Sequence, residues 1–113
     1  MNIQIFGTKK CQDTRKAERF FKERALKYQF IDLNEKGLSK GELKSVMSSV
    51  PLENLIDTNG KQYQKRNLKY LVHDVEEELL SDPLLIKTPI VRNGPKATVG
   101  YRPEVWNEWL HKE

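Results

Sequence analysis

The sequence predicts an α/β fold in which a helical insertion interrupts a four-stranded mixed sheet. Three observations indicate this fold. A strand, a helix and a second strand follow one another over residues 2–33. Helical spacing of apolar residues then dominates residues 38–80. Two short strands and an amphipathic helix follow from residue 87 onward, so the predicted order is β-α-β, helices, then β-β-α.

The first strand and helix place the single cysteine between them. Residues 2–6 alternate polar and apolar side chains, which is typical of a half-buried strand, and residues 7–10 break that pattern. From Gln12 onward the apolar side chains recur at the spacing of one helix face: Ala17, Phe20, Phe21 and Ala25. Cys11 is therefore predicted at a helix N-terminus, where unpaired backbone N–H groups and the helix dipole stabilise a thiolate.

Two interpretations of Cys11 are open from the residues alone. Free cysteine is among the most buried residue types, so the side chain can be a small core residue. Lys9, Lys10 and Arg15 lie close to it in the sequence, and positive charge beside a helix start lowers the pKa of a thiol. This context favours a reactive Cys11.

The second strand is predicted at residues 28–33, parallel to the first and joined to it by a right-handed crossover. In the insertion, Ser39-x-x-Glu42 is a capping box ahead of an apolar helical stripe that Pro51 ends. Residues 61–67 have no clear period and are expected to form a solvated loop or a basic rim near the cysteine. Residues 68–80 are predicted as one continuous helix.

The third strand is predicted at residues 87–92 and the fourth at residues 96–100, and the turn between them makes an antiparallel hairpin. A last helix begins at Pro103 and packs its tryptophans on the sheet. With the insertion, about residues 38–80, set aside, this is the thioredoxin-like order. The chain is expected to be a single domain over residues 1–113.

Composition narrows the classes of function. The net charge of +4 comes from 20 cations against 16 anions, a modest excess that suits a small oxyanion or an acidic partner surface. No dense basic stripe with interleaved aromatic residues is present, so direct nucleic-acid binding is not expected. One cysteine and two histidines without ligand spacing predict no metal site.

The expected location is the cytoplasm. No apolar stretch is long enough to cross a bilayer, and the first residues do not read as a signal peptide. A single cysteine cannot form an internal disulfide, which fits a reducing compartment.

Four short motifs follow one another along the chain, each occurring once. They are Cys11-x-x-x-Arg15 after the first strand, the segment 58–65, Thr88-Pro89-Ile90-Val91, and the segment 100–105 with sequence Gly-Tyr-Arg-Pro-Glu-Val. With these motifs the chain resembles the arsenate reductase/Spx-like family, a branch of the thioredoxin superfamily, over nearly its full length.

The resemblance implies a chemistry and a site. Cys11 matches the nucleophilic cysteine that attacks arsenate, after which glutathione attacks the adduct and glutaredoxin reduces the mixed product. Arg102 matches an anion-binding arginine, and Pro89 matches the cis-proline of thioredoxin-like folds. Arg15 and Lys10 are expected to face the same anion. No bound cofactor is implied, and glutathione or glutaredoxin is the implied thiol partner.

The chain departs from the reductases at two positions. Asn59 and Thr88 stand where those enzymes carry arginines. Lys87, Lys61 or Arg66 can supply charge instead, but a lysine lacks the planar fork that holds an oxyanion with two bonds. Two lost charge-assisted bonds, at about 1.5–3 kcal/mol each, weaken oxyanion binding by roughly two orders of magnitude or more. The sequence thus favours a single-cysteine, thiol-dependent oxidoreductase over arsenate reduction itself.

A regulatory adaptor is the alternative. The transcription regulators of the family use a Cys-x-x-Cys switch, and this chain has Thr14 at the second position, so that internal disulfide is excluded. Binding to RNA polymerase does not require the second cysteine. An Spx-like adaptor, in which Cys11 at most modulates the contact, therefore stays open.

Overall fold

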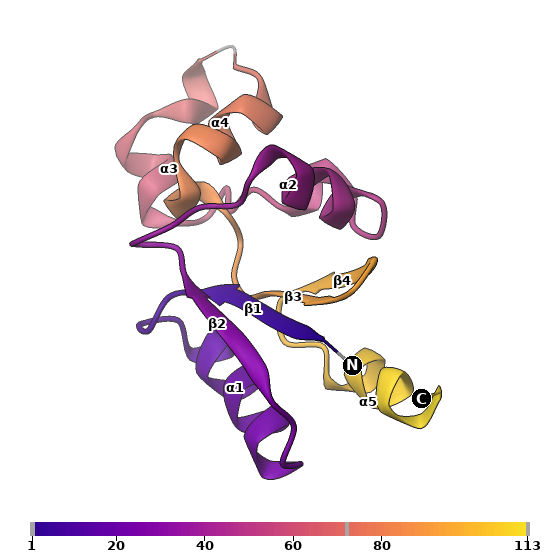
Figure 1. Ribbon diagram of the computed structural model, residues 1–113. Helices are drawn as coiled ribbons and strands as arrows, with labels where there is room; N and C mark the ends of the chain where they lie inside the picture. Colours follow the sequence, from indigo (N-terminus) through magenta and orange to yellow (C-terminus); the bar gives the residue numbers. More distant parts are fainter. Residues whose placement is uncertain (1, 72, 113) are drawn as a thin grey trace.

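The computed structural model describes residues 2–71 and 73–112. The sheet and the two helices beside it form one part of the molecule, and a run of short helices inserted between β2 and β3 lies above them in Figure 1. In chain order the elements are β1 (Ile3–Gly7), α1 (Gln12–Glu23), β2 (Tyr28–Asp32), α2 (Lys40–Met47), η1 (Leu52–Asn54), α3 (Lys61–Lys65), η2 (Leu68–Tyr70), α4 (Val75–Ser81), η3 (Pro83–Leu85), β3 (Ile90–Asn93), β4 (Lys96–Val99) and α5 (Pro103–Lys112), where η marks a 3₁₀ turn.

The four strands form one mixed sheet in the order β2-β1-β3-β4. Strand β1 pairs with β2 in parallel, with Ile5 opposite Phe30, and with β3 antiparallel, with Ile5 opposite Val91. Strands β3 and β4 form the antiparallel hairpin. This confirms the predicted thioredoxin-like mixed sheet with a helical insertion between its second and third strands.

Each face of the sheet has its own hydrophobic core. Helices α1 and α5 cover one face, and the insertion covers the other (Figure 1). Because side chains alternate along a strand, Ile3 and Ile5 of β1 enter the α1/α5 core while Phe6 enters the core under the insertion. Trp106 of α5 is fully buried, and its Nε1 donates a hydrogen bond of 2.8 Å to Thr98 Oγ1 of β4. The end of β1 that leads to Cys11 is thus held from both sides.

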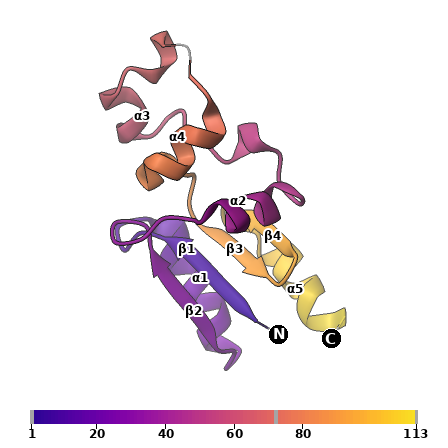
Figure 2. The same ribbon diagram turned by 45° about the horizontal axis from the view of Figure 1, so that its top comes forward.

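The insertion begins at the predicted capping box. The Glu42 backbone N donates to Ser39 Oγ at 3.1 Å, and the Ser39 backbone N donates to Glu42 Oε1 at 2.8 Å. Helix α2 packs against β4, and Leu79 of α4 enters the core under the insertion, whereas α3 lies farther from the sheet in both views (Figure 2).

Two predictions in the insertion are wrong. Residues 68–80 are not one helix, because Leu71 is extended and a new helix begins at Val75. Asp74 caps that helix by accepting a 3.2 Å hydrogen bond from the Glu77 backbone N. The apolar spacing resembles that of one helix because Leu68 of η2 and Leu79 of α4 enter the same core from two separate elements. Val72, which the predicted stripe included, lies outside the described residues.

The segment expected as a loop is instead the short helix α3. Its position is fixed by contacts distant in sequence, because Gln62 Nε2 donates to Asp82 Oδ2 at 2.7 Å. Arg66, directly after α3, bonds Asp82 at 3.1 Å and Glu78 at 2.7 Å. Across residues 2–71 and 73–112, no helix combines the length and apolar character needed to cross a membrane.

Candidate functional site

Cys11 lies where β1 ends and α1 begins, as the sequence predicts. It is the N-cap residue of α1, with an extended backbone, and its carbonyl accepts the Arg15 N–H at 3.2 Å. The loop before it is closed by a 3.2 Å hydrogen bond from the Cys11 N–H to the Thr8 carbonyl. The side chain is partly exposed, so the core interpretation of the cysteine is wrong.

The Cys11 sulfur contacts a threonine that lies 77 residues further along the chain. Thr88 Oγ1 donates to Cys11 Sγ at 3.0 Å, and the Thr88 carbonyl oxygen lies 3.8 Å from the same sulfur. Thr88 precedes β3 and is followed by buried Pro89, and the peptide bond between the two is cis. The sheet order explains the meeting, because β3 is the neighbour of β1.

A second threonine approaches from inside helix α1. Thr14 is fully buried, and within the described part of the chain its Oγ1 makes no hydrogen bond of ordinary geometry, although it lies close enough to the Cys11 sulfur to lower the pKa of that thiol. Gly7 leaves room for it, since a Cβ at that position would overlap the Thr14 hydroxyl. The close approach of these residues lets a buried hydroxyl reach the end of β1.

These contacts set the acidity of the thiol. Burial raises the pKa of Cys11, but hydrogen bonds from the Thr14 and Thr88 hydroxyls and from the backbone N–H groups of Thr14 and Asp13 lower it further than burial raises it. The net pKa lies below the ordinary value of a cysteine thiol. Each donor stabilises the thiolate more than the thiol, which is the condition for a nucleophilic cysteine.

The sulfur opens into a cleft of about 390 Å³. The charged residues in its lining are Lys10, Lys61 and Asp57. Leu33, which follows β2, and Leu84 of η3 contribute apolar surface. The cleft therefore lies between the sheet and the insertion, and it offers cations, one carboxylate and apolar walls within reach of one thiol.

The predicted site residues divide into two groups. Lys10 lines the cleft and Pro89 follows the threonine that contacts the sulfur, whereas Arg15, Lys87 and Arg102 do not line it. Arg15 Nε donates to the Lys9 carbonyl at 2.8 Å, which braces the loop before Cys11. The Lys87 side chain is exposed on the surface.

Arg102 lies beside a different hollow, with Pro51 and Val105. Its Nε donates to Glu104 Oε1 at 2.6 Å, and this hydrogen bond holds the pKa of Glu104 below its usual value. Of the cations considered as substitutes for the missing arginines, Lys61 lines the cleft, while Arg66 is engaged with Glu78 and Asp82.

Three members of the site have no functional role predicted from the sequence. Thr14 and Thr88 stand where related proteins carry a cysteine and an arginine, and Asp57 belongs to a segment with only a turn signal. A threonine at the third position of a helix that begins with cysteine is a usable signal, because the N-cap side chain approaches that residue. No group of three or more His, Cys, Asp or Glu side chains in the described ranges could hold a metal ion.

Comparison with known proteins gives a consistent result. A model described as the ArsC family matches residues 6–109. The chain is 31% identical over 115 residues to the uncharacterized protein YusI of Bacillus subtilis (strain 168), which covers 96% of this chain and 98% of that protein. It is 25% identical to the global transcriptional regulator Spx 2 of Oceanobacillus iheyensis, covering 100% of this chain and 87% of the regulator.

The fold also matches solved structures. A putative ArsC family related protein from Bacteroides fragilis superposes with a TM-score of 0.81 at 23% identity, covering 96% of this chain and 97% of the other. At that identity the similarity establishes the shared fold.

Proposed function

Because this chain belongs to the ArsC family, we propose that it is a thiol-dependent oxidoreductase whose nucleophile is the Cys11 thiolate. One observation carries the proposal. The sulfur caps helix α1, receives the Thr88 hydroxyl at 3.0 Å and opens into a cleft. A lowered thiol pKa and access for a substrate are what nucleophilic catalysis by cysteine requires.

The proposed substrate is a mixed disulfide that contains glutathione. The Cys11 thiolate attacks the glutathione sulfur, forms a Cys11–glutathione disulfide and releases the other half of the substrate as a thiolate, which takes up a proton. A second glutathione, attacking as its thiolate, then displaces Cys11 and leaves as glutathione disulfide. The net reaction consumes the mixed disulfide and one free glutathione thiol, releases the other half of the substrate as a thiol and forms glutathione disulfide, and Cys11 returns to its starting state.

The charges of the cleft support this substrate over a tetrahedral oxyanion. Glutathione carries two carboxylates and one ammonium group, and the cleft offers Lys10 and Lys61 together with Asp57. The same carboxylate would repel an arsenate dianion. The guanidinium groups of Arg15 and Arg102 do not line the cleft, so no planar fork meets an oxyanion there.

The position of Thr14 supports an external thiol as the second nucleophile. The chain has one cysteine, and Thr14 stands where a resolving cysteine would complete a Cys-x-x-Cys pair. Glutathione itself, or a glutaredoxin, therefore has to release Cys11 from its mixed disulfide.

The test is a turnover assay with glutathione and a glutathionylated peptide, in which glutathione disulfide formation is followed through NADPH and glutathione reductase. Arsenate replaces the peptide in a parallel arm. We expect turnover of the peptide, slow or no turnover of arsenate, and a Cys11–glutathione adduct by mass spectrometry. Absence of turnover and of the adduct, with Cys11→Ser as the blank, would refute the proposal.

An adaptor function is the second candidate, and the similarity to Spx 2 along the whole chain favours it. Its proposed partner is RNA polymerase. The assay is a pull-down of purified polymerase with wild-type protein and with Cys11→Ser. Equal capture by both, without turnover of the mixed disulfide, would support the adaptor, whereas no capture would refute it.

A further inference from the structure

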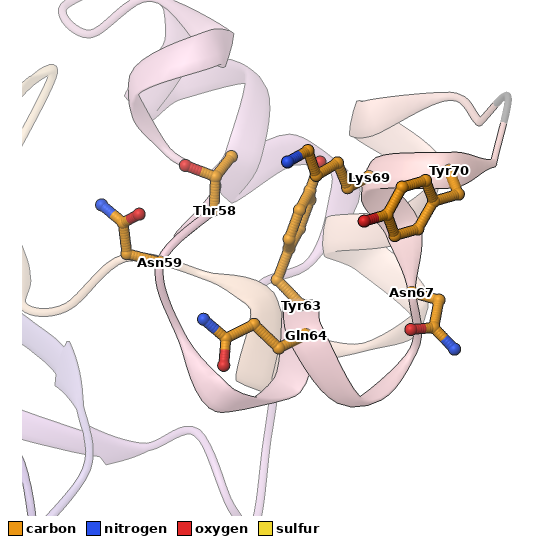
Figure 3. A pocket seen from close by; sticks show the side chains of 7 residues that line it. All are labelled: Thr58, Asn59, Tyr63, Gln64, Asn67, Lys69 and Tyr70. Atoms are coloured by element: carbon orange, nitrogen blue, oxygen red, sulfur yellow. The ribbon is translucent and has the colours of Figure 1, made fainter.

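A second hollow, of about 600 Å³, lies on the insertion and shares no lining residue with the Cys11 cleft (Figure 3). Tyr63 of α3 stands near its centre in this view, and Tyr70 of η2 lies at its side. Asn59, Gln64 and Asn67 carry primary amides around the two phenol rings. The proposed thiol chemistry uses none of these side chains.

The phenol and amide groups of this hollow form no side-chain hydrogen bond to any residue that the structure describes. Their neighbours behave differently, because Gln62 and Arg66 are bonded to Asp82. The hollow therefore presents donors and acceptors to an outside molecule, while the residues beneath it hold α3 in place.

The residue types are those of a protein-recognition surface. Tyrosine offers a large contact area with few rotatable bonds, and primary amides match the N–H and C=O groups of an extended peptide backbone. Tyr70 is 78% exposed and the next residue, Leu71, is 56% exposed. Both values are high for large apolar side chains; Tyr70 lines this hollow, and Leu71 lines the adjoining one.

The positive charge of residues 58–71 favours a partner that carries an acidic group. Residues 58–71 contain four cations and no acidic residue, and Arg66 among them is neutralised by Glu78 and Asp82. Lys69 lines the hollow, with its Nζ 5.8 Å from the centre of the Tyr70 ring. An acidic ligand group therefore has a cation to meet beside an aromatic face.

Acidic residues in the hollow next to this one argue against a nucleic acid as the ligand. Asp74, Glu77 and Glu78 line the adjoining hollow together with Leu71. A nucleic acid presents a phosphate at every nucleotide and would meet these carboxylates, whereas a peptide can carry one acidic side chain at one position.

We propose that this hollow docks an extended segment of a partner protein, which packs an apolar side chain between Tyr63 and Tyr70, pairs its backbone with the amides and places a carboxylate on Lys69. The surface is a recognition site separate from the Cys11 cleft, and it does not depend on the function proposed for that cleft.

Selection from a displayed library of random short peptides tests the proposal. We expect peptides enriched in one acidic and one apolar residue, with binding weakened about tenfold or more by Tyr70→Ala and by Lys69→Glu, since truncating a central interface residue costs more than about 1 kcal/mol. A matched pair exists elsewhere on the chain, because Lys16 Nζ lies 5.6 Å from the Tyr101 ring centre. Lys16→Glu and Tyr101→Ala should bind the peptides as wild type does.

Three results would overturn the proposal. One is a library that enriches no peptide. Another is peptides that bind Tyr70→Ala and Lys69→Glu as tightly as wild type, or that lose as much affinity with Lys16→Glu. The third is a single-stranded oligothymidine that binds more tightly than the selected peptides and loses that binding with Tyr70→Ala. Circular dichroism of each variant excludes loss of fold, which the exposure of Tyr70 makes unexpected.

Discussion

The Cys11 cleft and the hollow on the insertion differ in where their polar groups point. Around Cys11 two hydroxyls and two backbone N–H groups converge on one sulfur. Around Tyr63 the amides and phenols make no side-chain hydrogen bond within the described residues. Convergence on one atom changes the chemistry of that atom, whereas dispersed groups on a hollow recognise a shape. The difference separates a candidate reaction site from a candidate docking site.

Removing the sulfur should separate the two sites most sharply. Cys11→Ser should abolish turnover of a glutathione mixed disulfide, because a serine hydroxyl is not ionised near neutral pH and cannot form the adduct. Peptide binding at the insertion should be unchanged. Turnover assays and peptide titrations on the same preparation measure both effects. Residual turnover above the uncatalysed rate would show that another group carries the reaction.

Removing one converging hydroxyl should weaken the reaction without abolishing it. Thr88→Val deletes the 3.0 Å hydrogen bond to the sulfur and should raise the pKa of the Cys11 thiol, because the thiolate loses a donor. At a pH below that pKa the thiolate population falls, and the rate of adduct formation falls by about fivefold if the lost hydrogen bond is worth about 1 kcal/mol. The rate of alkylation by iodoacetamide against pH gives the pKa.

The control for that variant is Thr58→Val, which removes a hydroxyl from the insertion hollow. It should leave the alkylation profile of Cys11 unchanged. Equal profiles for wild type and Thr88→Val would show that the hydroxyl does not stabilise the thiolate.

The insertion should be held by Arg66 more than by its exposed lysines. Arg66→Ala leaves Asp82 and Glu78 without their guanidinium partner, and both carboxylates are mostly buried. We expect a loss of about 1–2 kcal/mol in unfolding free energy, measured by urea denaturation. Lys65→Ala, one residue earlier and exposed, serves as the control. A stability equal to that of wild type would mean that the ion pairs do not fix α3.

The smallest effect is expected at Arg102. Its guanidinium bonds Glu104 beside a separate hollow, so Arg102→Ala should change mixed-disulfide turnover by less than about twofold. The family resemblance implies a larger loss for an anion-binding arginine. A decrease in kcat/KM of about tenfold or more, with the fold intact, would place Arg102 in the reaction after all.

Local sequence patterns predicted the sheet well and the insertion less well. Alternation in residues 2–6 and the Ser39–Glu42 capping box are local signals, and both match the structure. Helix α3 is held in place by Asp82, which bonds Gln62 twenty residues before it and Arg66 sixteen residues before it. Contacts at such separations leave no local sequence pattern. The apolar spacing continues through residue 74, but the Asp74 side chain caps a new helix there and so ends the predicted continuous helix.

The site follows the same rule: its local features are predictable from the sequence, and its long-range contacts are not. The helix start at Cys11 is a local feature and was found. The Thr88 hydroxyl reaches the sulfur across 77 residues, and only the sheet order brings it there. A motif also does not tell where a flexible side chain points, which is why Arg102 was expected at the anion and lies beside Glu104.

The most direct test of the account is the pKa of Cys11 in the wild-type protein, measured by alkylation rate against pH and compared with the urea-unfolded chain. We predict a folded-state pKa of Cys11 below the unfolded value of about 8.5. The thiolate then adds stability above the unfolded pKa, and this stability is lost as the pH falls through the folded pKa. A folded pKa equal to or above the unfolded one would contradict the central claim, because the hydroxyls and N–H groups around the sulfur would then not stabilise its charge.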